Sequence, residues 1–306
     1  MTIRLLERLH PDAEAVLTEA GTVLWPNDPP APADAILTRG RGRVTAALMD
    51  ASPNLKAIAR AGVGVDNIDV AAATARAIPV VNAPGSTTLA VAEHTMLLML
   101  TALRRADTLY RWVKTEAWEQ RQHYQGQEAH GRTLGLVGMG DIAQRVAQLA
   151  TAFGMRVQYA NRSEKDVPYP RVPLDVLMQT SDVISLHVAL TPATQALIGT
   201  DELATLKPAA VLLNTARGAV VDEAAVLAAL EAGRLAVYAS DVLVNEPPPP
   251  EHALVDHPGF IGTPHVGAVT QAAYRTMCLH VATQVASLLQ FGAVDEGSVV
   301  NRERLY

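Results

Sequence analysis

Residues 134–143 read LGLVGMGDIA, and the architecture of the surrounding chain can be inferred from them. An apolar run typical of a buried strand leads into Gly138 and Gly140, and Ala143 completes the spacing G-x-G-x-x-A. Gly138 permits a tight turn, Gly140 lets a pyrophosphate approach the backbone, and Ala143 allows the following helix to pack closely on the strand. This order predicts a dinucleotide-binding unit with phosphates at the helix N-terminus. A tight turn without a ligand is the alternative.

The chain beyond this turn alternates between short apolar runs and helical patterns. The runs are TLGLVG, MRVQYA, DVISLHV, AAVLLN, LAVYASDV and GFIGTPH. Continuous apolar strands separated by helices are typical of a parallel sheet covered on both faces. In the first helix, Ile142, Val146, Leu149 and Phe153 recur at steps of three and four, which predicts its buried face, and Gly154 predicts its C-terminal cap.

The first third of the chain repeats this alternation, with candidate strands at AILTR, KAIAR and IPVVN. At 306 residues the chain is long enough for two domains. We therefore expect an α/β protein of two Rossmann-like, doubly wound domains: residues 1–94 with 275–306 as a flavodoxin-like substrate-binding domain, and residues 95–274 as the dinucleotide-binding domain. Helices over residues 90–114 and 271–289 would carry the chain across and back, which predicts a cleft between the domains.

Composition argues against several functional classes. Apolar residues make up 49% and charged residues 18%, as in globular proteins, and the net charge of -6 with scattered basic residues argues against nucleic-acid binding. The first residues lack the apolar core of a signal peptide, and the apolar run at residues 96–103 is too short to span a bilayer, so we expect a cytoplasmic protein without a membrane partner. Cys278, the single cysteine, is expected in the core, and we expect no metal site because no histidine spacing indicates one.

Three charged side chains follow three of the predicted strands. Arg217 lies in NTARGAVVD, Glu246 in DVLVNEP and His265 in TPHVG. The carboxyl ends of parallel strands meet at one sheet edge, where ligands bind. A forked guanidinium suits a carboxylate with an adjacent carbonyl, and a histidine beside a carboxylate can donate a proton near neutral pH. Together the three predict hydride transfer to a 2-keto acid, although each alone fits an ion pair, a loop charge or a capping histidine.

A second glycine pair, Gly62 and Gly64 in AGVGVDNID, follows another strand-like run. It lacks the third small residue, and Asp66 would repel phosphate. We interpret this turn as a nest of backbone N–H groups for a small carboxylate, with an ordinary tight turn as the alternative. The other histidines that we considered lie in a helix, at a strand end or in a proline-rich loop: His94, His187, His252 and His257.

Six stretches of the chain resemble the NAD(P)-dependent D-2-hydroxyacid dehydrogenase family. AGVGVDNID, GLVGMGDIA, LHVALTPATQALIG, NTARGAVVDEAAVLAAL, ASDVLVNEP and TPHVGAVT follow in the family's order, and the resemblance covers residues 35–285. The resemblance, which is to enzymes of the glyoxylate/hydroxypyruvate reductase kind, implies a homodimer of two-domain subunits with chemistry carried by Arg217, Glu246 and His265. It further implies that Val63 and Gly64 hold the substrate carboxylate, with Arg217 and His265 also at the substrate.

The resemblance also implies the cofactor contacts. Asp241 would meet the carboxamide of the nicotinamide, and residues 265–268 would flank its ring. The full implied set is Thr95, Gly138, Met139, Gly140, Asp141, Ile142, Asn161, Arg162, Ser163, His187, Val188, Thr215, Ala216, Arg217, Asp241, His265, Gly267 and Ala268.

Residues 159–163, YANRS, bear on which nucleotide is bound. Many family members end this second strand with an aspartate that binds both ribose hydroxyls, whereas Asn161, Arg162 and Ser163 stand here. An acid would repel a 2′-phosphate and an arginine would attract it, which favours NADP(H) over NAD(H). In the alternative, Glu164 turns inward to bind a ribose and NAD(H) is used.

The sequence indicates the identity of the keto acid less clearly than that of the cofactor. Arg39 and Arg60 fall at positions that resemble phosphoglycerate dehydrogenases, but the sequence stops at Tyr306 without the extra regulatory domain that many of those enzymes carry. We expect a small 2-keto acid such as glyoxylate or hydroxypyruvate, reduced to the D-2-hydroxy acid. The alternatives are a phosphoglycerate, phosphite or formate dehydrogenase of the same superfamily, and a non-catalytic dinucleotide-sensing corepressor.

Overall fold

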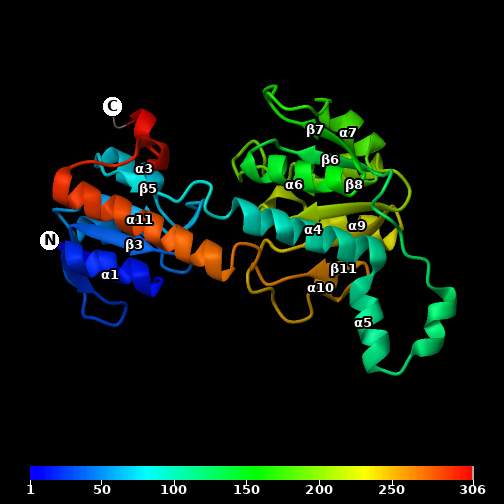
Figure 1. Cartoon of the computed structure of the whole chain (residues 1–306), viewed down its shortest axis with the longest axis horizontal. Helices are drawn as coiled ribbons and strands as arrows, with labels where there is room; N and C mark the ends of the chain where they lie inside the picture. The colour runs from blue at the N-terminus through cyan, green and yellow to red at the C-terminus, as the bar shows by residue number, and fades with distance from the viewer. Residues whose placement is uncertain (305–306) are drawn as a thin grey trace. The chain divides into compact units, whose positions relative to one another are not determined.

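The computed structural model describes residues 1–304 and contains two compact units, both visible in Figure 1. Unit 1 comprises Met1–Thr87 and Ala268–Tyr306, and unit 2 comprises Thr88–Gly267. Each unit is an α/β fold with its own parallel sheet, which confirms the predicted class of two Rossmann-like folds.

The unit boundaries lie earlier in the chain than residues 94 and 274, where the sequence placed them. The reason is that two long helices each belong to one unit over their whole length. α4 (Thr88–Arg104) packs on α6 (Asp141–Ala152) and on the sheet of unit 2. α11 (Gln271–Phe291) packs on α1 (Pro11–Ala20) in unit 1.

Unit 1 is built on a five-stranded parallel sheet in the order β2-β1-β3-β4-β5. The predicted runs are confirmed as β3, β4 and β5, whereas β1 and β2 were not predicted. Arg4 interrupts the apolar pattern of β1, and its guanidinium is buried by donating to the carbonyls of Trp25, Asp28 and Pro29. The strands are β1 (Thr2–Leu5), β2 (Thr22–Leu24), β3 (Ala35–Thr38), β4 (Ala57–Arg60) and β5 (Val80–Val81).

Helices cover both faces of the unit 1 sheet. Successive strand residues point to opposite faces, so Leu37 packs under α1 and α11, while Ile36 packs under α2 (Ala46–Asp50) and α3 (Val70–Ala75). Cys278, on the inner face of α11, is fully buried in the core, as expected.

Unit 2 is built on a six-stranded parallel sheet in the order β11-β10-β9-β8-β6-β7. All six predicted runs are strands. An isolated parallel bridge between Tyr159 and Arg171 adds a seventh segment beside β7. The strands are β6 (Thr133–Val137), β7 (Arg156–Ala160), β8 (Val183–Leu186), β9 (Ala210–Asn214), β10 (Leu235–Ser240) and β11 (Phe260–Gly262).

The unit 2 sheet is also covered on both faces. Leu213 faces the core under α4 and α6, whereas Leu212 faces the opposite core. The helices over that second core are α7 (Leu174–Thr180), α8 (Thr200–Ala204), α9 (Glu223–Glu231) and α10 (Ala253–Asp256). Because helices bury both faces of this sheet, the sequences of its central strands are nearly continuous apolar runs.

The buried face of α6 differs from the predicted one. Its fully buried residues are Ala143, Val146, Ala147 and Ala150, whereas Phe153 is 45% exposed. Small side chains allow α6 to lie close to α4 and the sheet, and Phe153 falls at the C-cap, where the chain turns out of the helix. The following glycine, at position 154, has φ 75 and ends the helix as expected.

The helix predicted over residues 90–114 is two helices. Arg105, with φ 46, is in the left-handed region and separates α4 from α5 (Ala106–Lys114), because an α-helix cannot continue through that conformation. Every side chain of α5 is at least partly exposed, and Tyr110 and Trp118 are exposed by 71% and 60%.

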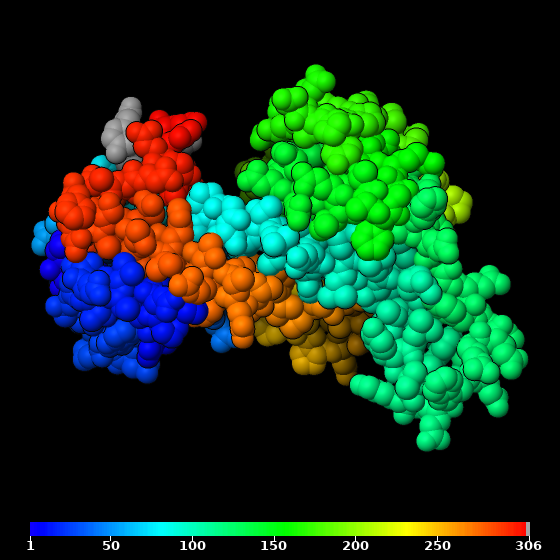
Figure 2. Space-filling model, in the orientation of Figure 1, coloured from blue at the N-terminus to red at the C-terminus, as the bar shows by residue number. Residues whose placement is uncertain are grey.

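Figure 2 shows α5 and η1 (Trp118–His123) standing out from the rest of unit 2. Their exposed apolar side chains are compatible with the expected homodimer, which stays a prediction, as does the cytoplasmic location. No helix within residues 1–304 has the length and apolar character needed to cross a membrane.

Candidate active site

The three predicted catalytic residues follow three neighbouring strands of unit 2. Arg217 follows β9, Glu246 follows β10 and His265 follows β11, and these strands are adjacent in the sheet. Because the sheet is parallel, all three side chains start from the same edge, at the carboxyl ends of the strands.

Glu246 and His265 are in direct contact. The distance from His265 Nδ1 to Glu246 Oε2 is 2.6 Å, and Glu246 Oε1 accepts the backbone N–H of Leu243 at 3.0 Å. Burial alone would raise the pKa of Glu246, but the hydrogen bonds from His265 and Leu243 outweigh it and lower that pKa below its usual range. The carboxylate therefore stays ionised near neutral pH, and it leaves Nε2 of His265 for a reacting group.

The backbone of His265 is held in an unusual conformation. Its φ is 53, which few residues other than glycine adopt, and its N–H donates to the carbonyl of Asp241 at 2.9 Å. The buried carboxylate of Asp241 accepts at 2.6, 2.9 and 2.8 Å from Thr263 Oγ1, Val266 N and Gly267 N. Asp241 therefore orders the loop that carries His265, and its predicted contact with a nicotinamide carboxamide stays a prediction.

The turn that carries Arg217 is shaped by Asn214, a residue that the sequence did not single out. Asn214 is fully buried; its Nδ2 donates to the Arg217 carbonyl at 2.9 Å, and its Oδ1 accepts the N–H of Ala216 at 3.0 Å. The half-buried Arg217 side chain donates from Nη1 to the Ala216 carbonyl at 2.7 Å. A polar residue ending the apolar run AVLLN was the available signal.

The Arg217 turn lies directly against the loop that carries Glu246. A Cβ atom placed on Gly218 would lie 2.0 Å from the carbonyl carbon of Leu243 and 2.4 Å from Val244 N. Only glycine allows two backbones to approach so closely. The contact brings all three predicted catalytic residues into one region of unit 2.

The glycine turn after β6 has the properties expected of a phosphate-binding turn. Gly138 has φ 97, and a Cβ there would lie 2.5 Å from the carbonyl oxygen of His187, so a side chain cannot be accommodated. Gly140 has φ -83, and a Cβ there would meet no atom of the described chain within 4 Å. Neither strain nor packing requires glycine at position 140, so the open space fits a ligand that approaches the backbone.

The N-terminus of α6 faces this open space. Within residues 1–304, no side chain caps its first turn, so the backbone N–H groups that begin with Asp141 are available to a pyrophosphate. Ala143 is fully buried, Met139 is nearly so, and Ile142 is half-buried. The backbone N–H groups at the start of α6 and the open space beside Gly140 together fit the pyrophosphate of a dinucleotide.

Two arginines lie at the end of β7. Asn161 Nδ2 donates to the Ser163 carbonyl at 2.8 Å, which closes a tight turn around the exposed Arg162. Arg171 donates from Nε to the Asn161 carbonyl and from Nη2 to the Arg162 carbonyl, both at 2.9 Å. Arg171 was not predicted, because its approach to β7 depends on the bridge with Tyr159.

The remaining predicted cofactor residues of unit 2 lie at the same sheet edge. Thr95 on α4 is buried and its hydroxyl is 2.9 Å from that of Thr215, which follows β9. Burial lowers the pKa of His187 to about 4, and its Nε2 is 2.9 Å from Ser185 Oγ, so this histidine is neutral at pH 7. Val188 follows it and is half-buried beside Gly138.

Three predicted ligand residues belong to unit 1. Val63 and Gly64 lie in the turn after β4, where Asn82 Nδ2 donates to the Val63 carbonyl at 2.7 Å, and Val63 is 41% exposed. Ala268 begins the second segment of this unit. Their contacts with substrate and cofactor stay predictions.

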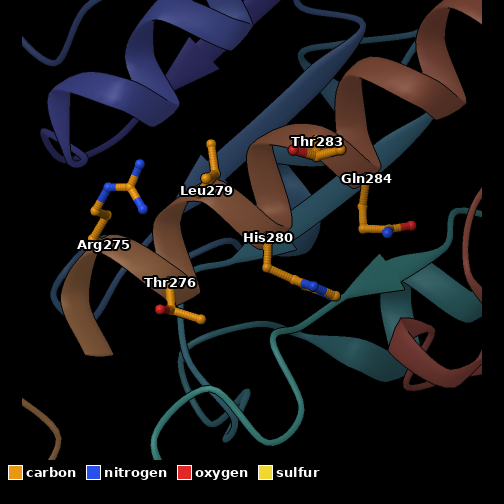
Figure 3. Close-up of a pocket in the computed structure, with 6 residues that line it drawn as sticks. All are labelled: Arg275, Thr276, Leu279, His280, Thr283 and Gln284. Carbon is orange, nitrogen blue, oxygen red and sulfur yellow. The ribbon is translucent and has the colours of Figure 1, made fainter. Parts of the chain in front are cut away.

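A shallow hollow lies on the surface of unit 1, along one face of α11 (Figure 3). It is lined only by that helix, and the one histidine there is engaged, since His280 Nε2 is 2.8 Å from Ser298 Oγ. In the described chain, no group of three or more His, Cys, Asp or Glu residues is arranged to hold a metal ion. The lining residues are Arg275, Thr276, Leu279, His280, Thr283 and Gln284.

Comparison with known proteins identifies the family. Residues 96–267, more than half of the chain, match the model of the D-isomer specific 2-hydroxyacid dehydrogenase, NAD binding domain. The chain belongs to the D-isomer specific 2-hydroxyacid dehydrogenase family. The matched residues include the glycine turn and all three predicted catalytic residues of this family.

Within the D-isomer specific 2-hydroxyacid dehydrogenases, the chain is similar to proteins named for different activities. It is 39% identical to D-3-phosphoglycerate dehydrogenase from Archaeoglobus fulgidus over 83% of this chain and 49% of that protein. It is also 39% identical to hydroxypyruvate reductase from Thermotoga maritima, over 82% of this chain and 83% of that protein. The chain spans about half the length of the phosphoglycerate dehydrogenases that it matches.

Among solved structures of these dehydrogenases, one is a complex with NADP and malonate. It is the NADPH-dependent glyoxylate/hydroxypyruvate reductase from Sinorhizobium meliloti, with a TM-score of 0.87 and 30% identity. The similarity covers 96% of this chain and 95% of that one.

Proposed function

We propose that this protein is an oxidoreductase that reduces a small 2-keto acid, of the glyoxylate or hydroxypyruvate class, to the D-2-hydroxy acid with NADPH. The observation that carries the proposal is the 2.6 Å contact between His265 and Glu246, at the carboxyl edge of a sheet whose first turn is built for a dinucleotide. Hydroxypyruvate and glyoxylate reductases among the relatives support the substrate class.

His265 is the proton donor in this proposal. The reduced nicotinamide, when bound, supplies a hydride to C2 of the keto acid and is oxidised. The carbonyl π electrons move to the oxygen, which takes a proton from Nε2 of the imidazolium. Glu246 stabilises that imidazolium through Nδ1, and the half-exposed ring then regains a proton from solvent.

Arg217 binds the substrate in this proposal. Its forked guanidinium would donate to the carboxylate and to the adjacent carbonyl oxygen, which develops negative charge as hydride arrives. The Asn214 hydrogen bonds fix the backbone of this turn, so the point from which the Arg217 side chain extends is set before substrate binds. Val63 and Gly64 would add backbone N–H groups to the same carboxylate.

Oxidation of 3-phosphoglycerate is the second candidate. Relatives named D-3-phosphoglycerate dehydrogenase are as similar to this chain as the reductases are, and Arg39 and Arg60 stand at the carboxyl ends of β3 and β4 in unit 1. Burial raises the pKa of Glu7, but backbone N–H groups of residues 39–42 outweigh it and lower that pKa to about 2. Glu7 thereby holds the Arg39 loop in place at this sheet edge.

A panel of substrates tests the proposal. Reduction of glyoxylate, hydroxypyruvate and phosphohydroxypyruvate would be followed with NADPH and with NADH, beside oxidation of formate and phosphite. We expect the highest kcat/KM with an unphosphorylated keto acid. Preference for phosphohydroxypyruvate would establish the second candidate instead, and turnover of formate or phosphite alone would refute both.

The cofactor preference is tested by Arg162→Ala. We expect the wild-type protein to have a higher kcat/KM for NADPH than for NADH, and the variant to lose roughly 10- to 100-fold for NADPH while NADH is little affected, because a charge-assisted bond to the 2′-phosphate is lost. Arg145→Ala, on the exposed side of α6, is the matched control. Equal use of both cofactors, unchanged by Arg162→Ala, would refute the preference.

A further inference from the structure

We propose that Glu223, together with His252, is a positioning residue that holds the Glu246 loop against the Arg217 turn. This inference rests on the proposed function, because its importance lies in the geometry of the catalytic residues. The contacts of Glu223 are with Val244 N and His252, so the proposed role is to position the catalytic residues through the loop.

The loop that carries Glu246 needs an anchor other than Glu246. Residues 241–252 form an irregular loop between β10 and α10. Both oxygens of Glu246 are already engaged, one by Leu243 N and the other by His265. Apolar packing holds Val242, which is 3% exposed, but it does not continue to Val244, which is 49% exposed.

Glu223 supplies that anchor from outside the loop. Its Oε1 accepts the backbone N–H of Val244 at 2.8 Å, and its Oε2 is 3.6 Å from Nε2 of His252. The Glu223 and His252 side chains are only 15% and 16% exposed. One carboxylate thus joins the beginning of the loop to its end.

The position of Glu223 links this anchor to the substrate-binding turn. Glu223 is the first residue of α9, six positions after Arg217 in the sequence, and the side chain of Asp222 already caps that helix by accepting from Ala224 N and Ala225 N. The Glu223 carboxylate is therefore free of a capping role. The Glu223 carboxylate and the close approach of Gly218 to Leu243 therefore both hold the Glu246 loop against the segment that carries Arg217.

The side-chain contact that His252 makes through Nε2 is with Glu223. Its Nδ1 is buried without a hydrogen-bond partner among the residues that the structure describes, and in that part of the chain its side chain does not cap α10. A buried polar atom without a partner is uncommon and calls for an explanation. A histidine at position 252 is explained if its Nε2 stabilises the Glu223 carboxylate, which is poorly solvated.

Three substitutions at Glu223 separate the parts of this proposal. Glu223→Ala removes both contacts and is expected to lower kcat/KM for the keto acid by about 100-fold, mainly through kcat, because a small misplacement of catalytic groups has effects of this size. Glu223→Gln keeps an acceptor for Val244 N and should retain most activity. Glu223→Asp keeps the charge but is one methylene shorter, so it should behave like Glu223→Ala. Glu231→Ala, exposed at the other end of α9, is the control.

The pH profile gives a readout that a general loss of stability would not produce. His265 and Leu243 N lower the pKa of Glu246, while burial and the charge of Asp241 oppose them. A loosened loop weakens the two hydrogen bonds, so that pKa rises and Glu246 is protonated at a higher pH. The acid limb of kcat/KM should therefore move to higher pH in Glu223→Ala and Glu223→Asp, but not in Glu231→Ala or Glu223→Gln.

Amide hydrogen exchange makes the test independent of turnover. We expect faster exchange at Val244 and its neighbours in Glu223→Ala and Glu223→Asp than in the wild-type protein, with equal NADPH affinity measured by fluorescence. If the wild-type protein reduces no keto acid, the proposed function fails, while the exchange rates still decide whether Glu223 holds the loop. A folded Glu223→Asp variant whose kcat, acid limb of kcat/KM and exchange rate at Val244 all equal those of the wild-type protein would overturn this inference. That result would leave the proposed function intact.

Discussion

Replacing His265 with asparagine is expected to lower kcat/KM for the keto acid by about 10²- to 10⁴-fold, the usual contribution of a general acid. Asparagine tolerates the left-handed backbone that His265 adopts at φ 53, so the loop should keep its conformation. The loss should fall on kcat rather than on KM, because the proton is transferred only in the transition state. Steady-state kinetics with NADPH and hydroxypyruvate provide the measurement.

The control for His265→Asn is the same substitution at His123, which is exposed in η1. His123→Asn should leave both kinetic constants unchanged. Fluorescence titration should show that His265→Asn still binds NADPH, which would separate lost chemistry from lost folding. A variant with wild-type kcat would rule out His265 as the acid, whereas a wild-type protein that binds NADPH but reduces no keto acid would favour the alternative of a dinucleotide-binding protein without catalysis.

Arg217→Ala is expected to lower kcat/KM by about 10²- to 10³-fold, as the removal of a donor to developing negative charge usually does. Unlike the histidine variant, it should also raise KM, because the guanidinium binds the carboxylate before reaction. Arg217→Lys keeps the charge but not the forked geometry, so it should recover only part of the loss. Arg234→Lys, at an exposed position after α9, serves as the matched control.

Chemical rescue sharpens the test of Arg217. Added guanidinium ion should restore part of the activity of Arg217→Ala, because it can occupy the space of the missing group, and it should do nothing for His265→Asn. An Arg217→Ala variant with unchanged KM for every keto acid would show that the substrate carboxylate is bound elsewhere.

The architecture of unit 2 was predictable because its strands are buried on both faces. Most of the six strands read as short, largely apolar runs, and the glycine turn after β6 marks where the first helix begins. In unit 1 the signal is weaker. Arg4 lies within β1 and is buried only because three backbone carbonyls accept its donors, which no local pattern reveals.

Helix details escaped prediction for a different reason. Arg105 has an ordinary side chain for a helix, and its left-handed backbone follows from the end of α4 and the start of α5 rather than from its own preference. Phe153 continues a helical spacing but falls at the C-cap of α6 and is exposed. A periodic pattern predicts that a helix exists better than it predicts where the buried face ends.

The placement of the three predicted catalytic residues could be predicted from the sequence, whereas the residues that support them could not. Arg217, Glu246 and His265 follow predicted strands, so a parallel sheet places them at one edge. Asn214 and Glu223 act through hydrogen bonds to backbone atoms that are distant or unremarkable in the sequence. Such contacts depend on side-chain directions that become known only once the loops are placed.

Isotope transfer tests the central claim most directly. Hydroxypyruvate would be reduced with NADPH that carries two deuterium atoms at C4 of the nicotinamide, and the product would be examined by mass spectrometry and chiral chromatography. We predict a D-configured 2-hydroxy acid with one deuterium at C2, formed in much smaller amount by His265→Asn and by Arg217→Ala. A product without deuterium at C2, or equal yields from all three proteins, would contradict hydride transfer at this site.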